Sequence, residues 1–192
     1  VSFIAQDGIG PVDVTGNVGG TGVTANLVSF LADDNGDFAG DIPSIDVSGT
    51  IGTAGAGVAF AAVDIGPIAA ADIGAGAGAV GFTANGTNAT DGVGGGLITS
   101  VDVTNDMAAG AGGVTFTADD GVGPVTIGGD AGRGGVITFN TNADNTDDTG
   151  SLGAVSAQTF GNTVQAAAED GVGAQQTVVI NTRGVAGTDN TN

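Results

Sequence analysis

The sequence predicts an all-β fold, a parallel β-helix (a β-solenoid) of about seven irregular rungs, where a rung is one coil of the chain. Three observations predict it. Apolar and polar residues alternate over short segments, glycine-rich turns separate these segments, and a segment containing phenylalanine recurs along the chain. The alternation has the period of a strand that buries one face. Because the repeat covers nearly the whole chain, we expect a single β-repeat domain over residues 1–192.

The repeat is clearest over residues 114–129. A Val-Thr-Phe-Thr-Ala segment is followed there by an Asp-Asp-Gly turn, and a Gly-Pro step then opens a second alternating segment. Proline is tolerated at the first residue of a strand, where its missing N–H costs no ladder hydrogen bond. The same order of segments occupies residues 1–16. Rungs are predicted to start near Val1, Val28, Val58, Val80, Val114, Ile137 and Gln158.

The phenylalanines define columns that the fold should contain. In a parallel β-helix, equivalent residues of successive rungs stack about 4.8 Å apart. The residue two positions before each phenylalanine is usually valine, so both positions are expected to face inward. The phenylalanines that mark the rungs are spaced 21 to 34 residues apart: Phe3, Phe30, Phe60, Phe82, Phe116, Phe139 and Phe160.

An antiparallel β-sandwich or jelly roll is the alternative fold. Turn signals about every 8–12 residues suit such a sandwich as well, and the variable repeat length argues against a regular solenoid. Helical signals are weak. Ile68–Asp72 and Val164–Glu169 are alanine-rich windows, but glycine lies close on either side of both.

Charge limits the partners that the chain can bind. The formal net charge is −19, and Arg133 and Arg183 are the only cationic side chains. Binding to nucleic acid is excluded in practice, because neutralising phosphates requires Lys and Arg. An anionic membrane surface is disfavoured for the same reason, and no apolar stretch is long enough to span a membrane. Binding of divalent cations is favoured by the same negative charge.

Calcium is the ion that the acidic turns would take, since it prefers carboxylate and carbonyl oxygens. In stacked rungs, aspartates at one corner would repel each other unless they were solvated or bridged by a cation. The segment 33–37 resembles the first half of a D-x-[DN]-x-D calcium loop, although it lacks the distal Glu. Hydrated Asx turns are the alternative interpretation. The candidate metal ligands are Asp33, Asp34, Asn35, Asp37, Asp41, Asp119, Asp120 and Asp144.

The remaining sequence features concern glycosylation and catalysis. Asn85 and Asn88 begin N-glycosylation tripeptides, Asn-Gly-Thr and Asn-Ala-Thr. The chain has no Cys or His, a single Glu, and no Lys after its glycine runs. Without Trp or Tyr it also lacks the usual sugar platforms. We therefore expect no enzymatic activity and no organic cofactor.

The Val-x-Phe-x-Ala, Asp-Gly and Gly-Pro-Val pattern, with abundant Gly, Ala, Val, Thr and Asp, resembles the repeat-rich β-solenoid surface proteins of microbes. These include adhesins and the subunits of sheaths, surface layers and extracellular filaments. The resemblance implies a secreted structural protein at the cell surface that assembles with other copies of itself, and the net charge suggests help from cations. A start at Val1 without Met fits a mature secreted chain, or a piece of a longer one. An adhesin or glycan-binding module of a larger surface protein is the alternative.

Overall fold

The structure is a computed structural model, which describes residues 1–19, 27–32, 40–52, 57–74, 78–86, 96–107, 113–132, 135–141, 151–160, 163–167 and 180–182. No helix occurs among these residues, so none there could cross a membrane. Every pairing between the described strands is parallel. The predicted all-β class with parallel strands is confirmed, and the antiparallel sandwich is wrong for the described strands.

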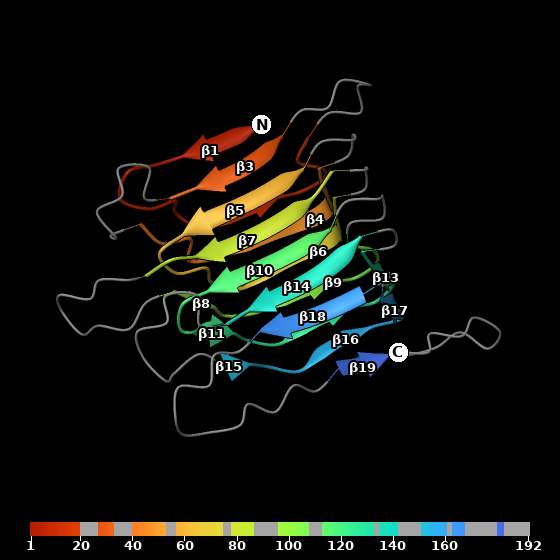
Figure 1. The fold of residues 1–192 in the computed structure, drawn as a ribbon. Helices are drawn as coiled ribbons and strands as arrows, with labels where there is room; N and C mark the ends of the chain where they lie inside the picture. The colour runs from red at the N-terminus through yellow and green to blue at the C-terminus, as the bar shows by residue number, and fades with distance from the viewer. Residues whose placement is uncertain are drawn as a thin grey trace.

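Two seven-stranded sheets contain most of the strands, and the chain visits them alternately (Figure 1). The first sheet has the order β1 (Ser2–Ile4), β3 (Val28–Leu31), β5 (Val58–Ala62), β7 (Val80–Ala84), β10 (Val114–Ala118), β14 (Val136–Asn140) and β18 (Thr163–Ala167). The second has the order β2 (Val12–Val14), β4 (Ile45–Ile51), β6 (Ile68–Ile73), β9 (Val101–Val103), β12 (Val125–Ile127), β16 (Val155–Ala157) and β19 (Ile180–Thr182). In the structure, a rung is a strand of the first sheet together with the strand of the second sheet that follows it in the chain.

Two smaller sheets lie at the corners between the large ones. The strands β8 (Leu97–Ile98), β11 (Gly121–Val122) and β15 (Ser151–Leu152) pair where the chain leaves the first sheet. The strands β13 (Asp130–Ala131) and β17 (Thr159–Phe160) pair where it leaves the second. The first six rungs therefore contact their neighbours along both sheets and at both corners.

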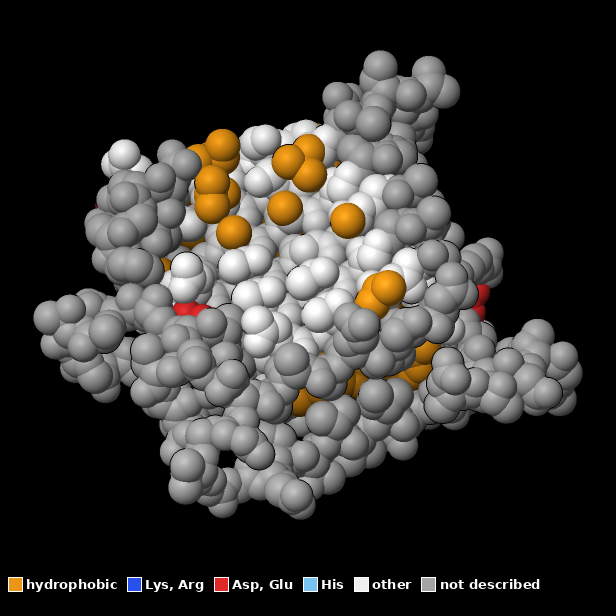
Figure 2. Space-filling view, in the orientation of Figure 1, with side chains coloured by type: hydrophobic (Ala, Val, Ile, Leu, Met, Phe, Trp, Pro, Cys, Tyr) orange, Lys and Arg blue, Asp and Glu red, His pale blue; other side chains and the backbone are white. Residues whose placement is uncertain are grey.

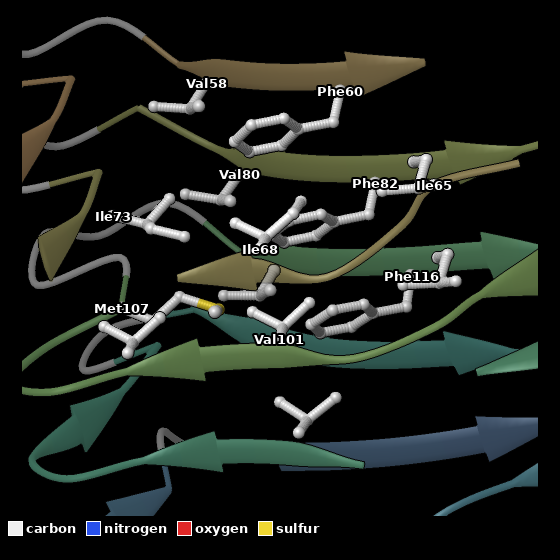
Figure 3. Close-up of a cluster of buried hydrophobic side chains, with 14 of the residues drawn as sticks. Val58, Phe60, Ile65, Ile68, Ile73, Val80, Phe82, Val101, Met107 and Phe116 are labelled. Carbon is white, nitrogen blue, oxygen red and sulfur yellow. The ribbon is translucent and has the colours of Figure 1, made fainter. Parts of the chain in front are cut away.

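The phenylalanine column fills the core next to the first sheet. Phe30 pairs in register with Phe3 and Phe60, and the same register continues to Phe139. Successive rings are nearly parallel, with centroids 4.6 to 5.1 Å apart. Valines and isoleucines stack beside the rings in the same way (Figure 3). The inward Val-x-Phe positions predicted from the sequence are thus observed.

The last rung differs from the prediction. Phe160 does not join the phenylalanine column, because its strand β17 pairs with β13 and places it opposite Ala131. The seventh strand of the first sheet is β18, whose Ala166 lies opposite Phe139. This rung therefore enters the first sheet at Thr163 and not near Gln158. The sequence carried a hint, since Gln158 stands where the other copies have an apolar residue.

Both alanine-rich windows are strands and not helices. Residues 68–73 form β6, between β4 and β9, and residues 163–167 form β18, beside β14. Alanine is a good helix former, but here the strands of neighbouring rungs pair with both segments, and Ile68, Ala70 and Ile73 of β6 also lie in the core. Tertiary pairing overrides the local propensity.

We predict that replacing a phenylalanine in the middle of the column destabilises the fold more than replacing the first one. Phe82 is fully buried, with a stacked ring on each side, so Phe82→Ala should cost about 3–5 kcal/mol in the free energy of unfolding. Phe3→Ala should cost clearly less, because Phe3 is only partly buried. Denaturant unfolding of both variants measures the difference. Equal losses of unfolding free energy in the two variants would contradict the greater burial of Phe82.

Candidate functional site: acidic corners and an open end

A column of polar residues runs along the corner that follows the second sheet. Each member directly precedes an inward-facing residue, and these inward residues pair from rung to rung: Val18 with Ile51, Ile73 with Met107, and Met107 with Ala131. Because those neighbours are in register, the polar residues are too. We call this set the corner column: Asn17, Thr50, Asp72, Asp106 and Asp130.

Side chains of the corner column bind the backbone of the next rung. The Thr50 N–H donates to Asn17 Oδ1 at 2.8 Å. The Asp106 N–H donates to Asp72 Oδ1 at 3.1 Å, and the Asp130 N–H donates to Asp106 Oδ1 at 2.8 Å. The Thr50 hydroxyl also donates to Asp72 Oδ2 at 3.3 Å. Oxygen acceptors at this corner therefore connect consecutive rungs.

The other corner uses aspartate in the same way. The Asp64 N–H donates to Asp41 Oδ1 at 3.2 Å. Asp64 Oδ1 in turn accepts hydrogen bonds from the N–H groups of Gly96 and Leu97, at 2.9 and 2.8 Å. A carboxylate that accepts two backbone N–H groups is held by charge-assisted bonds. Acid is thus placed where the chain turns and a backbone donor needs an acceptor.

Among the predicted metal ligands that the structure describes, Asp41 lies apart from Asp119 and Asp120. Asp33, Asp34, Asn35, Asp37 and Asp144 lie outside the described residues. Asp41 belongs to the second rung and Asp119 and Asp120 to the fifth, three rungs or about 14 Å along the stack. In the described part of the chain, no three acidic side chains converge on one point. Calcium binding stays a prediction.

Asp119 has a place of its own within the first corner. Its side chain is only 3% exposed, and its backbone N–H donates to the Ala84 carbonyl at 3.2 Å. Gly96 lies against it with a positive φ of 101°, and a Cβ built there would come within 2.6 Å of the Asp119 Cβ. Glycine is therefore required at 96 for two reasons, backbone conformation and space.

One of the two predicted glycosylation positions can be placed. Asn85 is exposed, and its backbone N–H donates to the Ala62 carbonyl at 2.9 Å. Asn88 lies outside the described residues. Glycosylation of either asparagine stays a prediction.

The sequence alone did not single out Asp72, Asp106 and Asp130 as a set. Their signal is a polar residue directly before an apolar one at the end of each second segment: Asn-Val, Thr-Ile, Asp-Ile, Asp-Met and Asp-Ala. The spacing between these dipeptides varies. Only the strand register shows that they share one column.

We call the outer side of the first rung, which no described residue covers, the open end. Its inward residue Val1 is 53% exposed, whereas Val28, at the same position in the second rung, is 1% exposed. The next inward positions show the same contrast. In the first rung Phe3, Ile9, Val12 and Val14 are only partly buried, and their counterparts Phe30, Ile42, Ile45 and Val47 are at most 1% exposed.

Glycines before proline reveal the same open end. A Cβ on Gly66 would overlap the Pro43 carbonyl oxygen of the preceding rung, and a Cβ on Gly123 would overlap the Thr99 carbonyl oxygen. Gly10 occupies the same register position and also precedes proline, but a Cβ on Gly10 would meet no atom within 4 Å. These glycines belong to the first, third and fifth rungs. A glycine at position 10 would leave room for the carbonyl of a preceding rung, yet no described residue lies there.

Comparisons with protein-family models, with curated proteins and with solved structures found no match to this chain.

We predict that Asp106 acts through its acceptor oxygen and not through its charge. Asp106→Asn keeps an Oδ1 for the Asp130 N–H and removes repulsion from Asp72 and Asp130, so its stability should equal or exceed that of the parent. Asp106→Ala leaves the Asp130 N–H without this acceptor and should lose about 1 kcal/mol. Thermal unfolding compares the two. An Asn variant as unstable as the Ala variant would show that the charge itself is needed, as in a cation bridge.

Proposed function

We propose that this chain is a secreted structural protein that assembles end to end with other copies of itself into an extracellular filament, sheath or surface layer. The open first rung is the observation that carries the proposal. It presents partly buried apolar side chains and the terminal strands of both large sheets at one end of the stack. Such strand edges favour the addition of a strand from a neighbouring chain.

The contact would repeat what the interior already contains. The strands β1 and β2 each pair with the next strand of their sheet, in parallel and in register. A rung from a second copy would add a parallel strand to each on the other side. It would cover Phe3, whose ring already stacks on Phe30 at 4.7 Å. Burial of apolar surface and backbone hydrogen bonds would act together.

The proposed architecture is a parallel β-helix of about seven rungs. The alternation of the chain between two parallel seven-stranded sheets supports it, as do the stacked columns and the cross-rung bonds at both corners. A regular stack of this kind has two ends that differ, so copies adding in one direction would form a polar fibre.

Net charge opposes this assembly. Each copy carries a formal charge of −19, and repulsion between copies falls as salt shortens the Debye length to about 8 Å at physiological ionic strength. We therefore propose that cations assist assembly. The scarcity of Lys and Arg, two in all, suits an extracellular setting because trypsin-like proteases have few places to cut.

Gly10→Ala tests the open end directly. Within one copy the added methyl meets no atom, so the variant should keep the parent's unfolding free energy to within about 0.5 kcal/mol. In an end-to-end assembly, the same methyl would meet the carbonyl of the added rung, as it would at Gly66. Electron microscopy and sedimentation should then show fibres for the parent and short particles for Gly10→Ala.

Gly66→Ala is the matched control, since its methyl overlaps the Pro43 carbonyl inside the monomer and should destabilise the fold. If Gly10→Ala assembles like the parent, the first rung is not the assembly contact. If the parent itself forms only isolated rods at all salt concentrations, the adhesin alternative gains support.

Cation dependence is predicted as well. Assembly of the parent should increase with NaCl and further with Ca²⁺, and it should reverse on dialysis into chelator at low salt. Light scattering during dialysis measures this. Fibres that persist unchanged in chelator would show that assembly does not depend on divalent cations. They would not contradict the end-to-end contact.

A further inference from the structure

The outer face of the first sheet carries no charge in its described part, although the chain as a whole is strongly acidic. Two outward-facing columns flank the phenylalanine positions, in register from rung to rung. The column before phenylalanine contains Ser2, Ser29, Ala59, Gly81, Thr115 and Thr138, and the column after it contains Ile4, Leu31, Ala61, Thr83, Thr117 and Asn140. We call these twelve residues the neutral face.

The second sheet has a different outer face. Asp13, Asp46 and Asp102 lie in one register column there, and all three are exposed. Acidic residues also line both corners. Figure 2 looks onto the first sheet and shows uncharged and apolar side chains across its described surface, with acidic ones only toward the sides. The neutral face is thus the described surface on which another copy meets least repulsion.

The neutral face is also smooth and large enough for a weak contact. Most of its side chains are small, and a Cβ at Gly81 would meet nothing within 4 Å. Its six strands are three to five residues long and spaced about 4.8 Å apart, so they cover roughly 430 Å². Two such faces would bury roughly 860 Å² in total, the size of a weak interface. Ile4, at one end of the face, is 59% exposed.

We propose that the neutral face packs against the neutral face of a second copy, so that fibres pair side by side. Sheets with small side chains can pack face to face about 10 Å apart. The distribution of charge indicates which partner binds the neutral face. A cationic partner would find its complement on the second sheet or the corners, whereas a copy of this chain approaches most closely where neither partner has a carboxylate. Exposed aliphatic side chains at one end add apolar burial.

This lateral contact is separate from the end-to-end contact of the proposed function and is tested in the Gly10→Ala background, which blocks the ends. Thr115 is the second residue of β10 and Thr126 is the middle residue of β12. They belong to the same rung and are both exposed, one on the neutral face and the other on the second sheet. Thr115→Asp and Thr126→Asp therefore add the same charge at matched positions on opposite faces.

Sedimentation velocity over a concentration series gives the outcome. The Gly10→Ala protein should form a dimer, Thr115→Asp in that background should weaken the dimer at least about tenfold, and Thr126→Asp should leave it within about threefold of the parent dimer. A monomeric Gly10→Ala protein at about 1 mM would overturn the proposal, as would equal effects of the two Asp substitutions. Higher oligomers of Gly10→Ala that grow along the fibre axis would instead contradict the end contact, so the two failures are distinguishable.

Discussion

In-register parallel pairing is the constraint on which the rest of this structure depends. Once each rung lies directly over the next, every inward position becomes a column, and every column must contain apolar side chains that can pack on one another. Phenylalanine does so with nearly parallel rings, whose centroids are at most 5.1 Å apart. Corner residues become columns by the same rule, which brings aspartates of successive rungs close together.

The placement of acid follows from this constraint. Like charges in adjacent rungs repel, yet a backbone N–H at a turn needs an acceptor. At Asp72 and Asp106 the side-chain hydrogen bonds to the next rung offset part of that repulsion. The neutral face contrasts with these acidic corners. The described acidic residues lie at the corners and on the second sheet, and the outer face of the first sheet carries uncharged residues.

Much of the fold could be predicted from the sequence, because its signals are local. The Val-x-Phe alternation indicated the strand face, and the Gly-Pro step indicated the start of the second strand. Phe160 was misplaced because a phenylalanine looks the same in sequence whether it fills the main column or a corner. Asp72, Asp106 and Asp130 were missed as a set because their common position is defined by register, and the loops between rungs vary in length. The lower burial of the first rung could not be predicted from the sequence, since its inward residues are of the same types as those of the second rung.

The Gly-Pro step has a further consequence. It occurs in the first, third and fifth rungs, while the second and fourth carry Pro-Ser and Thr-Ser at the same register positions. Single rungs differ in length, whereas the two successive pairs that each begin in a Gly-Pro rung differ by one residue: Phe3 to Phe60 is 60 − 3 = 57 residues and Phe60 to Phe116 is 116 − 60 = 56 residues. Over these five rungs the unit of repetition is therefore a double rung, in which one member supplies a bulky residue and its carbonyl and the other supplies the glycine that fits over it. Duplication of such a pair would lengthen the stack without creating an unmatched junction, whereas insertion of a single rung would place two like members against each other.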